Sequence, residues 1–446
     1  MKFRLPTCVL CAILSLGLGM SHGQTSEMQT ILRAEPVVSL MPIGGNLYVM
    51  QPSQLVVWNR INPPQSLLNK DGIGGMNRLV WPGGGILGAC QLQASGKWAE
   101  FPGLMGADLV GVCRHPEEQR LCFLTEDGRL LGADTGTKEV AAIFDNLPKA
   151  LGIGAGRPRM RALFAAHDRM YVANDLDQAQ ATAGLRGSGR LAEWDWRGAW
   201  RIIESIPFVE ITGAEGTNGE RSDLVFALGY DELSLVLRVW HRNQWKRYRL
   251  PWRERPAGQM GNRIREISTD RWLMQAFGNF YQLQPPAPGI TAPRVKPVCA
   301  CLEPILDFCA FRGNIVMAGG QNDRLTGSAQ PLFKETSLDA MGSGTKPSGK
   351  GAVWRNAMVG AGTTSDSFLV DGFDKKTVHF SNESDQPMQF DIEVDVTGTD
   401  VFRGLYRMEV PGRSYVPYVF PQGYSATWMR VKSISPGAVT VEVSMD

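Results

Sequence analysis

Five charged side chains stand in short apolar segments that the strand pattern predicts to be largely enclosed: Arg161, Glu210, Arg265, Glu266 and Asp307. Enclosing a charge without a partner is costly, because the charge loses its hydration. Guanidinium groups bind carboxylates and sulfates through paired N–H donors, so one hypothesis is a site for an anionic sugar. The alternative hypothesis is that these residues form ion pairs with one another and join neighbouring segments.

Two histidines are candidates for proton transfer. His167 lies in the turn Ala-Ala-His-Asp-Arg, and His241 follows directly after Trp240. An imidazole can act as a general base near neutral pH. The alternative is structural, with His167 as a turn residue and His241 at the end of a strand. No histidine pair has the helical spacing of a zinc site, so we expect no histidine-based metal centre.

The tryptophans fall into two groups. Four recur at equivalent places in successive strand groups: Trp58, Trp194, Trp240 and Trp354. A repeated position in a repeat protein usually indicates packing between neighbouring units. Three fall outside that pattern: Trp196, Trp252 and Trp272. These three are the better candidates for stacking on a ligand, and we include Trp196 among the candidate site residues.

A polar segment, Asn174-Asp-Leu-Asp177, resembles part of a calcium loop. It lacks the glycine at the sixth position and the glutamate at the twelfth that an EF-hand requires. Calcium at Asp175 and Asp177 is therefore a hypothesis that needs ligands from elsewhere in the chain. No other cofactor is expected.

Two pairs of cysteines are close in the sequence. Cys113 and Cys122 flank a predicted turn between strands, and this spacing predicts a cross-strand disulfide. Cys299 and Cys301 are separated by one residue, which differs from the two-residue gap of zinc knuckles. Burial or bridging, and not metal binding, is the expected role of this second pair.

The composition is that of a globular protein, with 43% hydrophobic and 20% charged residues in a chain of 446. The formal net charge is only +2, so bulk charge does not support a nucleic-acid partner. A chain of this length has room for two domains, one of them large.

The first residues have the pattern of a secretory signal peptide. Lys2 and Arg4 precede an apolar run over 7–20, and small residues at Ser21 and Gly23 suit cleavage before Gln24. Residues 1–23 are therefore predicted to be removed, and the protein is predicted to be exported to the periplasm or beyond the cell. No later segment is apolar enough over about 20 residues to predict a membrane span.

Residues 33–360 alternate short apolar runs with turns rich in Gly, Pro, Asn and Asp. The strand groups recur every ~35–50 residues, which is typical of propeller blades, and about seven such groups would close a ring. The predicted fold class is all-β, a β-propeller of about seven blades. A pair of stacked β-sandwiches is the alternative. The innermost strands are expected at 160–164, 208–211, 264–267 and 305–309, and the last blade is expected to contain Gly351–Trp354.

The pattern changes after the segment 360–364. Apolar residues alternate with polar ones over 389–396 and again over 439–445. Each of these segments is typical of a strand with one buried and one solvated face. Residues 364–446 are therefore predicted to form a separate, small β-sandwich.

Several stretches resemble a group of uncharacterised exported bacterial β-propeller proteins with a C-terminal β-sandwich. The stretches that carry the resemblance are Gly189–Asp195, Phe226–Asp231, Arg263–Ile267, Ile305–Phe308 with Asn314–Gly320, and Asp371–Lys376. The resemblance implies the architecture and carries no catalytic residue.

Three functions are compatible with these patterns. The first is binding of a carbohydrate or other extracellular ligand at the propeller axis or over one face. The second is a polysaccharide lyase or glycoside hydrolase with an axial active site. The third is a scaffold for protein partners. The expected partner is an extracellular glycan or protein.

Overall fold

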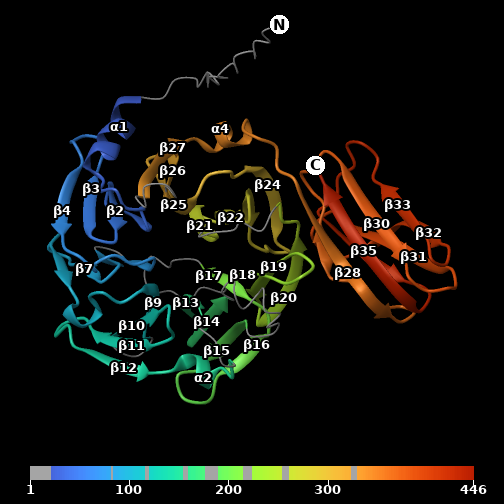
Figure 1. Ribbon diagram of the computed structural model, residues 1–446, viewed down its shortest axis with the longest axis horizontal. Coiled ribbons are helices and arrows are strands. Elements are labelled where there is room, and N and C mark those ends of the chain that lie inside the picture. Colours follow the sequence, from blue (N-terminus) through green and yellow to red (C-terminus); the bar gives the residue numbers. More distant parts are fainter. Residues whose placement is uncertain are drawn as a thin grey trace, which may run out of the picture.

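The computed structural model describes residues 22–81, 84–115, 120–153, 159–175, 189–213, 224–253, 261–322 and 329–446. Almost all regular structure in these ranges is β-strand, which confirms the predicted all-β class. Figure 1 shows strands β1 to β27 as a ring of small sheets, with strands β28 to β35 beside one edge of the ring.

Consecutive strands form the sheets of the ring, and each sheet is antiparallel. The first two sheets contain β1 (Ser39–Ile43), β2 (Asn46–Gln51), β3 (Gln54–Trp58), β4 (Gln65–Asn69), and β5 (Arg78–Trp81), β6 (Gly84–Leu87), β7 (Cys90–Leu92), β8 (Trp98–Glu100). The next two contain β9 (Leu109–Arg114), β10 (Arg120–Thr125), β11 (Leu130–Asp134), β12 (Val140–Phe144), and β13 (Arg159–Ala166), β14 (Arg169–Asp175), β15 (Arg190–Trp194), β16 (Arg201–Glu204). The last three contain β17 (Phe208–Gly213), β18 (Leu224–Tyr230), β19 (Leu235–His241), β20 (Gln244–Leu250); β21 (Arg263–Ser268), β22 (Arg271–Ala276), β23 (Asn279–Gln284), β24 (Arg294–Ala300); and β25 (Ile305–Phe311), β26 (Asn314–Asn322), β27 (Ala329–Thr336).

The first strand of each sheet contacts the first strands of the two neighbouring sheets, and β25 contacts β1, so the contacts run completely around the ring. The expected inner strands lie in β13, β17, β21 and β25. Neighbouring inner strands approach closely where a glycine allows it. A Cβ at Gly111 of β9 would lie 2.5 Å from the Cβ of Leu163 in β13. This radial arrangement of small antiparallel sheets is that of a β-propeller.

Tight hairpins connect the strands within a sheet. His167 and Asp168 join β13 to β14 with φ angles of 54° and 55°, and Arg242 and Asn243 join β19 to β20 with φ angles of 50° and 63°. Two central residues with positive φ define a type I′ turn, whose twist matches that of the flanking strands. The polar residues between the apolar runs of the sequence are therefore turn residues.

Three short α-helices and one 3-10 helix, Pro102–Leu104, accompany the strands in the described residues; the α-helices are α1 (His22–Ile31), α2 (Leu147–Ala150) and α4 (Leu338–Gly342). Helix α1 packs against β27, the last strand of the three-stranded sheet. Met28 of α1 is fully buried in a cluster with Trp58 and Phe333. The predicted cleavage before Gln24 would fall near the start of α1 and leave Met28 in place.

Two four-stranded groups face each other in the C-terminal part. One contains β28 (Gly349–Val359), β35 (Gly437–Met445), β30 (Lys376–Asn382) and β33 (Tyr415–Val419). The other contains β29 (Ser367–Leu369), β34 (Trp428–Ser433), β31 (Met388–Asp395) and β32 (Arg403–Val410). The alternating segments 389–396 and 439–445 fall in β31 and β35, and their apolar side chains share one core. Phe380 and Phe390 meet across this core with ring centroids 5.2 Å apart.

One strand assignment from the sequence is wrong. Gly351–Trp354, expected in the last blade, lies in β28 and pairs with β35 of the C-terminal group. The predicted boundary between the propeller, 33–360, and the sandwich, 364–446, therefore assigns β28 to the propeller. In the structure, β28 forms hydrogen bonds with β35 of the C-terminal group. Independent folding of residues 364–446 stays a prediction.

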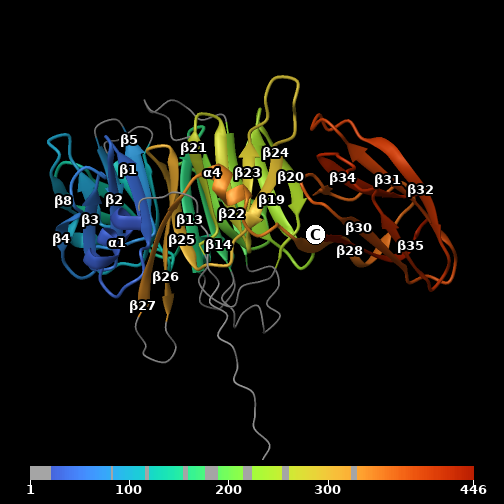
Figure 2. The same cartoon turned by 90° about the horizontal axis from the view of Figure 1, so that it is seen from above.

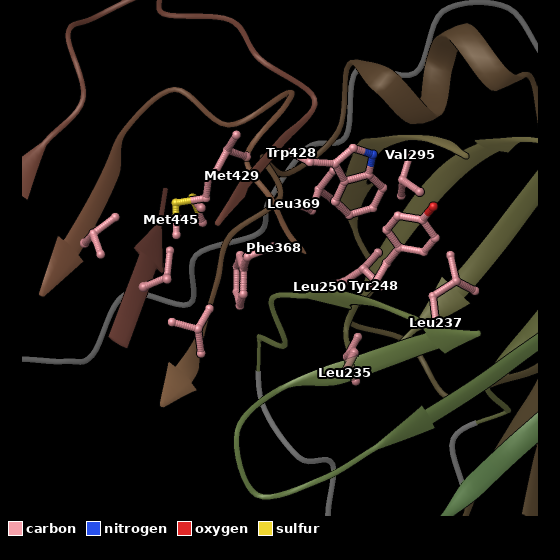
Figure 3. Packing of buried hydrophobic residues seen from close by; sticks show 14 of the residues in the cluster. Leu235, Leu237, Tyr248, Leu250, Val295, Phe368, Leu369, Trp428, Met429 and Met445 are labelled. Atoms are coloured by element: carbon pink, nitrogen blue, oxygen red, sulfur yellow. The ribbon is translucent and has the colours of Figure 1, made fainter. Parts of the chain in front are cut away.

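The C-terminal strands join the ring through hydrogen bonds and a shared core. Strand β29 pairs parallel to β20, so the fifth sheet of the ring continues into the C-terminal group as one eight-stranded sheet. Figure 3 shows Trp428 beside Tyr248, whose ring centroid is 4.7 Å away, with Leu369 and Val295 close by. Figure 2 shows the C-terminal strands extending outward from the rim of the ring. The two parts therefore meet over a packed apolar junction.

Charged groups reinforce this junction. Arg249 in β20 donates from Nη1 and Nη2 to Asp231 at 2.9 and 2.8 Å, and from Nε to Asp366 at 2.8 Å. Asp366 directly precedes β29. Burial of Asp231 acts to raise its pKa, but the hydrogen bond and charge of Arg249 outweigh burial and hold the pKa below its ordinary value. The junction is thus held by ion pairs as well as by apolar contacts.

Candidate functional site

Three of the predicted charged residues meet at the inner strands. The Arg265 side chain donates from Nε to Asp307 Oδ1 at 3.0 Å and from Nη1 to Glu210 Oε1 at 2.8 Å. Its Nη2 lies 2.9 Å from the same Asp307 oxygen. All three residues are buried. Arg265 in β21 therefore links β17 on one side to β25 on the other.

The chain of contacts extends beyond these three residues. Arg263, which the sequence analysis did not single out, donates from Nη1 to Glu210 Oε2 at 2.7 Å. Asp307 Oδ2 accepts a hydrogen bond of 2.9 Å from the backbone N–H of Leu40 in β1. Arg78 of β5 donates to the carbonyl oxygen of Leu40 at 2.7 Å. Charged side chains thus connect five consecutive sheets and help to close the ring between β25 and β1.

The electrostatics of Asp307 agree with a structural role. Burial acts to raise the pKa of this carboxyl, but the positive charges of Arg265, Arg78 and Arg263 outweigh burial and hold the pKa below its ordinary value. Asp307 is therefore ionised at neutral pH. It serves as the counter-ion of Arg265. This agrees with the alternative hypothesis that these charged residues form ion pairs with one another.

Arg161 has carboxylates nearby, Glu126 in the turn after β10 and Asp175 at the end of β14. Its Nη1 lies 3.9 Å from Glu126 Oε1, and Arg159 donates to the same oxygen at 2.9 Å. Burial acts to lower the pKa of Arg161, and the negative charge of Asp175 opposes this effect. Arg161 therefore interacts with the third and fourth sheets, whereas Arg265 interacts with the fifth and seventh.

Two other predicted candidates lie apart from this cluster. Glu266 is half-buried, and its Oε1 accepts a hydrogen bond of 3.2 Å from the backbone N–H of Asp270 in the next turn. His167 occupies the hairpin turn between β13 and β14, and its ring packs 5.9 Å from that of Trp240. The structure does not bring Glu266 or His167 together with Arg265 and Asp307. His241 ends β19, as its structural alternative stated.

The three candidate tryptophans differ in their burial. Trp252 and Trp272 are buried in the largest apolar cluster, so they are core residues and not exposed platforms. Trp196 is half-buried, with its ring 4.5 Å from that of His115 and 5.5 Å from that of Trp194. Trp196 therefore packs among aromatic side chains.

The repeated tryptophans also need one correction. Trp58, Trp194 and Trp240 lie in β3, β15 and β19, which are the third strands of their sheets. Trp354 lies in β28 of the C-terminal group, so it is not equivalent to the other three. The reason is that β28 follows the last ring sheet in the sequence but pairs with the end of the chain.

The expected calcium ligands are only partly described. Asp175 ends β14 and accepts a hydrogen bond from the hydroxyl of Tyr230, while Asp177 lies outside the described residues. Within the described ranges, no group of three or more His, Cys, Asp or Glu side chains could hold a metal ion.

The cysteine prediction is half right. Cys113 and Cys122 face each other across β9 and β10, as the spacing predicts, but both thiols are free. Burial and a hydrogen bond to Cys122 raise the pKa of Cys113. Cys299 and Cys301 are also free and buried. The predicted disulfide is therefore wrong.

A second polar site lies in a groove between the first and second sheets, and we call it the groove. Its volume is about 500 Å³, within the usual range for ligand pockets of about 300–1,000 Å³. The lining residues are Asn46, Tyr48, Val57, Trp58, Asn59, Asn62, Pro63, Gln65, Leu67, Leu68, Gly96, Lys97 and Trp98. They come from the start of β2, the end of β3, the loop between β3 and β4, strand β4, the turn before β8 and the first residue of β8.

The sequence analysis missed the groove. The one local signal was a pair of amides, Asn59 and Asn62, in the loop that follows Trp58. Trp98 and Lys97 come from the next sheet, and no spacing in the sequence indicates that they lie beside that loop. The groove exists because two sheets of the ring lie side by side (Figure 1).

Comparisons with known proteins find only distant structural similarity. No family model matches the chain, and no curated protein matches it. Among solved structures, the Cps50 (Swd1) β-propeller domain of Myceliophteria thermophila has 12% identity and a TM-score of 0.43, covering 68% of this chain and 98% of that one. The WD40 repeats of RRP9 have 11% identity and a TM-score of 0.45, with 68% and 96% covered. YCF48 bound to a D1 peptide has 10% identity and a TM-score of 0.40, with 68% and 94% covered. At such values these comparisons transfer no ligand or activity to this chain.

Proposed function

We propose that this protein is a protein-interaction scaffold, in which a β-propeller holds a C-terminal binding surface in a fixed orientation. The proposal is supported by the junction between β20 and β29, where one sheet and one apolar core continue from the ring into the C-terminal strands. A rigid junction keeps a bound partner at a constant position relative to the ring.

The surface that we propose for the partner is the tyrosine strip, defined as Tyr406, Tyr415, Tyr418 and Val419 along the edge strands β32 and β33. Tyr415 and Val419 lie on the outer face of β33, whereas Tyr418 lies on the other face and packs against the apolar core. Tyr406 in β32 and Tyr418 in β33 stack with centroids 4.9 Å apart, although they belong to the edge strands of different sheets. Tyr415 is 55% exposed and Val419 is 63% exposed. Tyrosine is enriched at protein interfaces, because it buries a large area while losing little side-chain entropy.

The edge strand itself limits how a partner can bind. Strand β33 is the last strand of its sheet and pairs only with β30 among the strands described. Pro417 lies at its centre and has no N–H to donate. A proline at this place blunts the edge against continuous strand addition. The partner is therefore a protein that contacts the tyrosine strip through side chains.

The structure gives less support to the two axial hypotheses. Arg265, one of the arginines proposed for an anionic sugar, already has two carboxylate partners in the protein, and Arg161 lies 3.9 Å from Glu126. A glycoside hydrolase needs one carboxyl group whose pKa is raised so that it can donate a proton. The pKa of Asp307 is instead lowered. If the protein were a polysaccharide lyase, incubation with acidic polysaccharides would form a product that absorbs ultraviolet light.

Export remains part of the proposal and rests on the first residues of the sequence. None of the helices described is long and apolar enough to cross a membrane. N-terminal sequencing of secreted material should find Gln24 as the first residue. Finding Met1 as the first residue would contradict the proposed cleavage and export.

A photo-cross-linking amino acid at Val419 tests the scaffold function, with the same amino acid at Ile202 as the matched control. Ile202 is also exposed but lies on β16 of the ring. We expect a specific protein to cross-link from Val419 and not from Ile202. Binding of that purified protein should weaken at least tenfold in Tyr415→Ala, because a central tyrosine of an interface contributes about 1–2 kcal/mol or more. Equal cross-linking from both positions, or unchanged affinity of the Tyr415→Ala variant, would overturn the proposal.

A further inference from the structure

The groove is far from the tyrosine strip, and its chemistry differs from that of the strip. It combines aromatic rings with amides, and among its lining residues Lys97 carries the only formal charge. Because no lining residue is a carboxylate, the groove offers no acid or base pair for hydrolysis. Its residues are suited to binding.

One wall of the groove is aromatic. Trp98 at the start of β8 is half-buried, and its ring meets that of Tyr48 edge-on with centroids 5.1 Å apart. Trp58 is fully buried and packs against Phe311 and Phe333, with centroids 5.9 and 5.6 Å away. Packing of this kind holds the aromatic side chains in place before a ligand arrives, which reduces the entropy lost on binding.

Four amides line the same space: Asn46, Asn59, Asn62 and Gln65. The Oδ1 of Asn59 accepts hydrogen bonds from the backbone N–H groups of Ile61 and Asn62 at 3.0 and 2.8 Å. This turn fixes the Asn59 side chain and leaves its NH₂ group available. The side chains of the other three amides make no hydrogen bond to any residue that the structure describes. Amide groups that can both donate and accept therefore converge on one space.

We propose that the groove binds a short, neutral oligosaccharide. A pyranose ring has an apolar C–H face that packs on an aromatic ring, and hydroxyl groups that both donate and accept hydrogen bonds. Amide side chains match hydroxyl groups in both directions. A proline-rich peptide would also use the aromatic wall, but its backbone at proline offers acceptors alone. Three amides with both functions, together with the NH₂ group of Asn59, therefore favour the saccharide.

The inference does not depend on the scaffold function, because it concerns different residues in a different part of the molecule. A saccharide in the groove would contact the first and second sheets, whereas the protein partner would contact β32 and β33. The two sites should therefore be separable by substitution.

The test uses the full chain and a panel of defined neutral oligosaccharides, including gluco-, xylo-, manno- and chito-oligosaccharides, each titrated to millimolar concentration. Calorimetry and tryptophan fluorescence measure binding. We expect at least one of them to bind, Trp98→Ala to weaken it at least tenfold, and Trp98→Phe to retain part of the affinity. Asn59→Ala and Gln65→Ala should each weaken binding severalfold.

Two controls make the outcome decisive. Trp196→Ala removes another half-buried tryptophan outside the groove and should leave the affinity unchanged. Tyr415→Ala should also leave saccharide binding unchanged, because it belongs to the tyrosine strip. The Gln65→Ala variant is informative even if Trp98→Ala fails to fold, since Gln65 is exposed. The proposal is overturned if no oligosaccharide in the panel binds, if binding survives both Trp98→Ala and Gln65→Ala, or if only a proline-rich peptide binds the groove.

Discussion

The axis of the ring and the groove beside its first two sheets both gather polar side chains, but these side chains find their partners in different places. At the axis, Arg265 contacts Asp307 and Glu210 at 2.8–3.0 Å, so the protein itself satisfies each charge. In the groove, the amide groups of Asn46 and Gln65 have no hydrogen-bond partner in the described chain. Enclosed charges on the inner strands therefore pair with one another across neighbouring sheets, and these ion pairs help to close the ring. Polar groups left unpaired at a hollow surface are better candidates for binding.

The strongest test of this comparison is Arg265→Met. Removing the guanidinium leaves Asp307 buried without its main counter-ion, so the free energy of unfolding should fall by about 3–5 kcal/mol. Chemical denaturation measures this change. Lys97→Met in the groove is the matched control and should cost little, because Lys97 is exposed. An Arg265→Met variant as stable as the parent would show that the axial charges are not structural.

The same ion pair predicts a dependence on pH. Asp307 has a lowered pKa in the folded protein, so it contributes stability above the unfolded pKa of about 4, and this contribution is lost as pH falls through the folded pKa. We expect the difference in Tm between the parent and Arg265→Met to shrink as pH is lowered from 7 to about 3. A difference that stays constant across this range would rule out titration of Asp307 as its source.

Arg161→Met should have a smaller effect than Arg265→Met. Glu126 keeps Arg159 at 2.9 Å, and Asp175 keeps the hydroxyl of Tyr230, so no carboxylate is left without a donor. We expect a loss of about 1 kcal/mol in the free energy of unfolding, which is typical of single substitutions. A loss as large as that of Arg265→Met would mean that Arg161 and Arg265 contribute equally to the stability of the ring.

The smallest effect on stability is expected in the groove. Asn62→Ala and Gln65→Ala remove exposed amides whose side chains bond to no described residue, so each should change the free energy of unfolding by less than about 0.5 kcal/mol. Thermal melting checks this value beside the saccharide titrations. If either substitution destabilised the protein as much as a buried one does, the contrast between groove and axis would disappear.

Local patterns in the sequence were enough to predict many strands of the ring, including the four expected inner strands, and the pairing of neighbouring strands within a sheet. The alternation of apolar and polar residues has a period of two in any strand, and short polar turns such as His167-Asp168 force the next strand to pair with the previous one. For the same reason, the alternating segments 389–396 and 439–445 were recognised as strands with one buried face. The inner strands followed from their place at the start of each group, and so did the alternative hypothesis that the charged residues in them form ion pairs with one another.

Three features depended on the tertiary structure. Strand β28 pairs with β35, which lies near the other end of the C-terminal segment, and no local period indicates a partner so far along the chain. The choice between a ligand and a protein carboxylate as the partner of Arg265 required distances between β17, β21 and β25. The groove required two sheets to lie side by side, so that Trp98 of one stands next to Tyr48 of the other. Sequence periodicity reports which face of a strand is buried, because burial repeats with the backbone geometry. Which distant strands share an edge, and which side chains remain unpaired afterwards, is decided when the sheets pack.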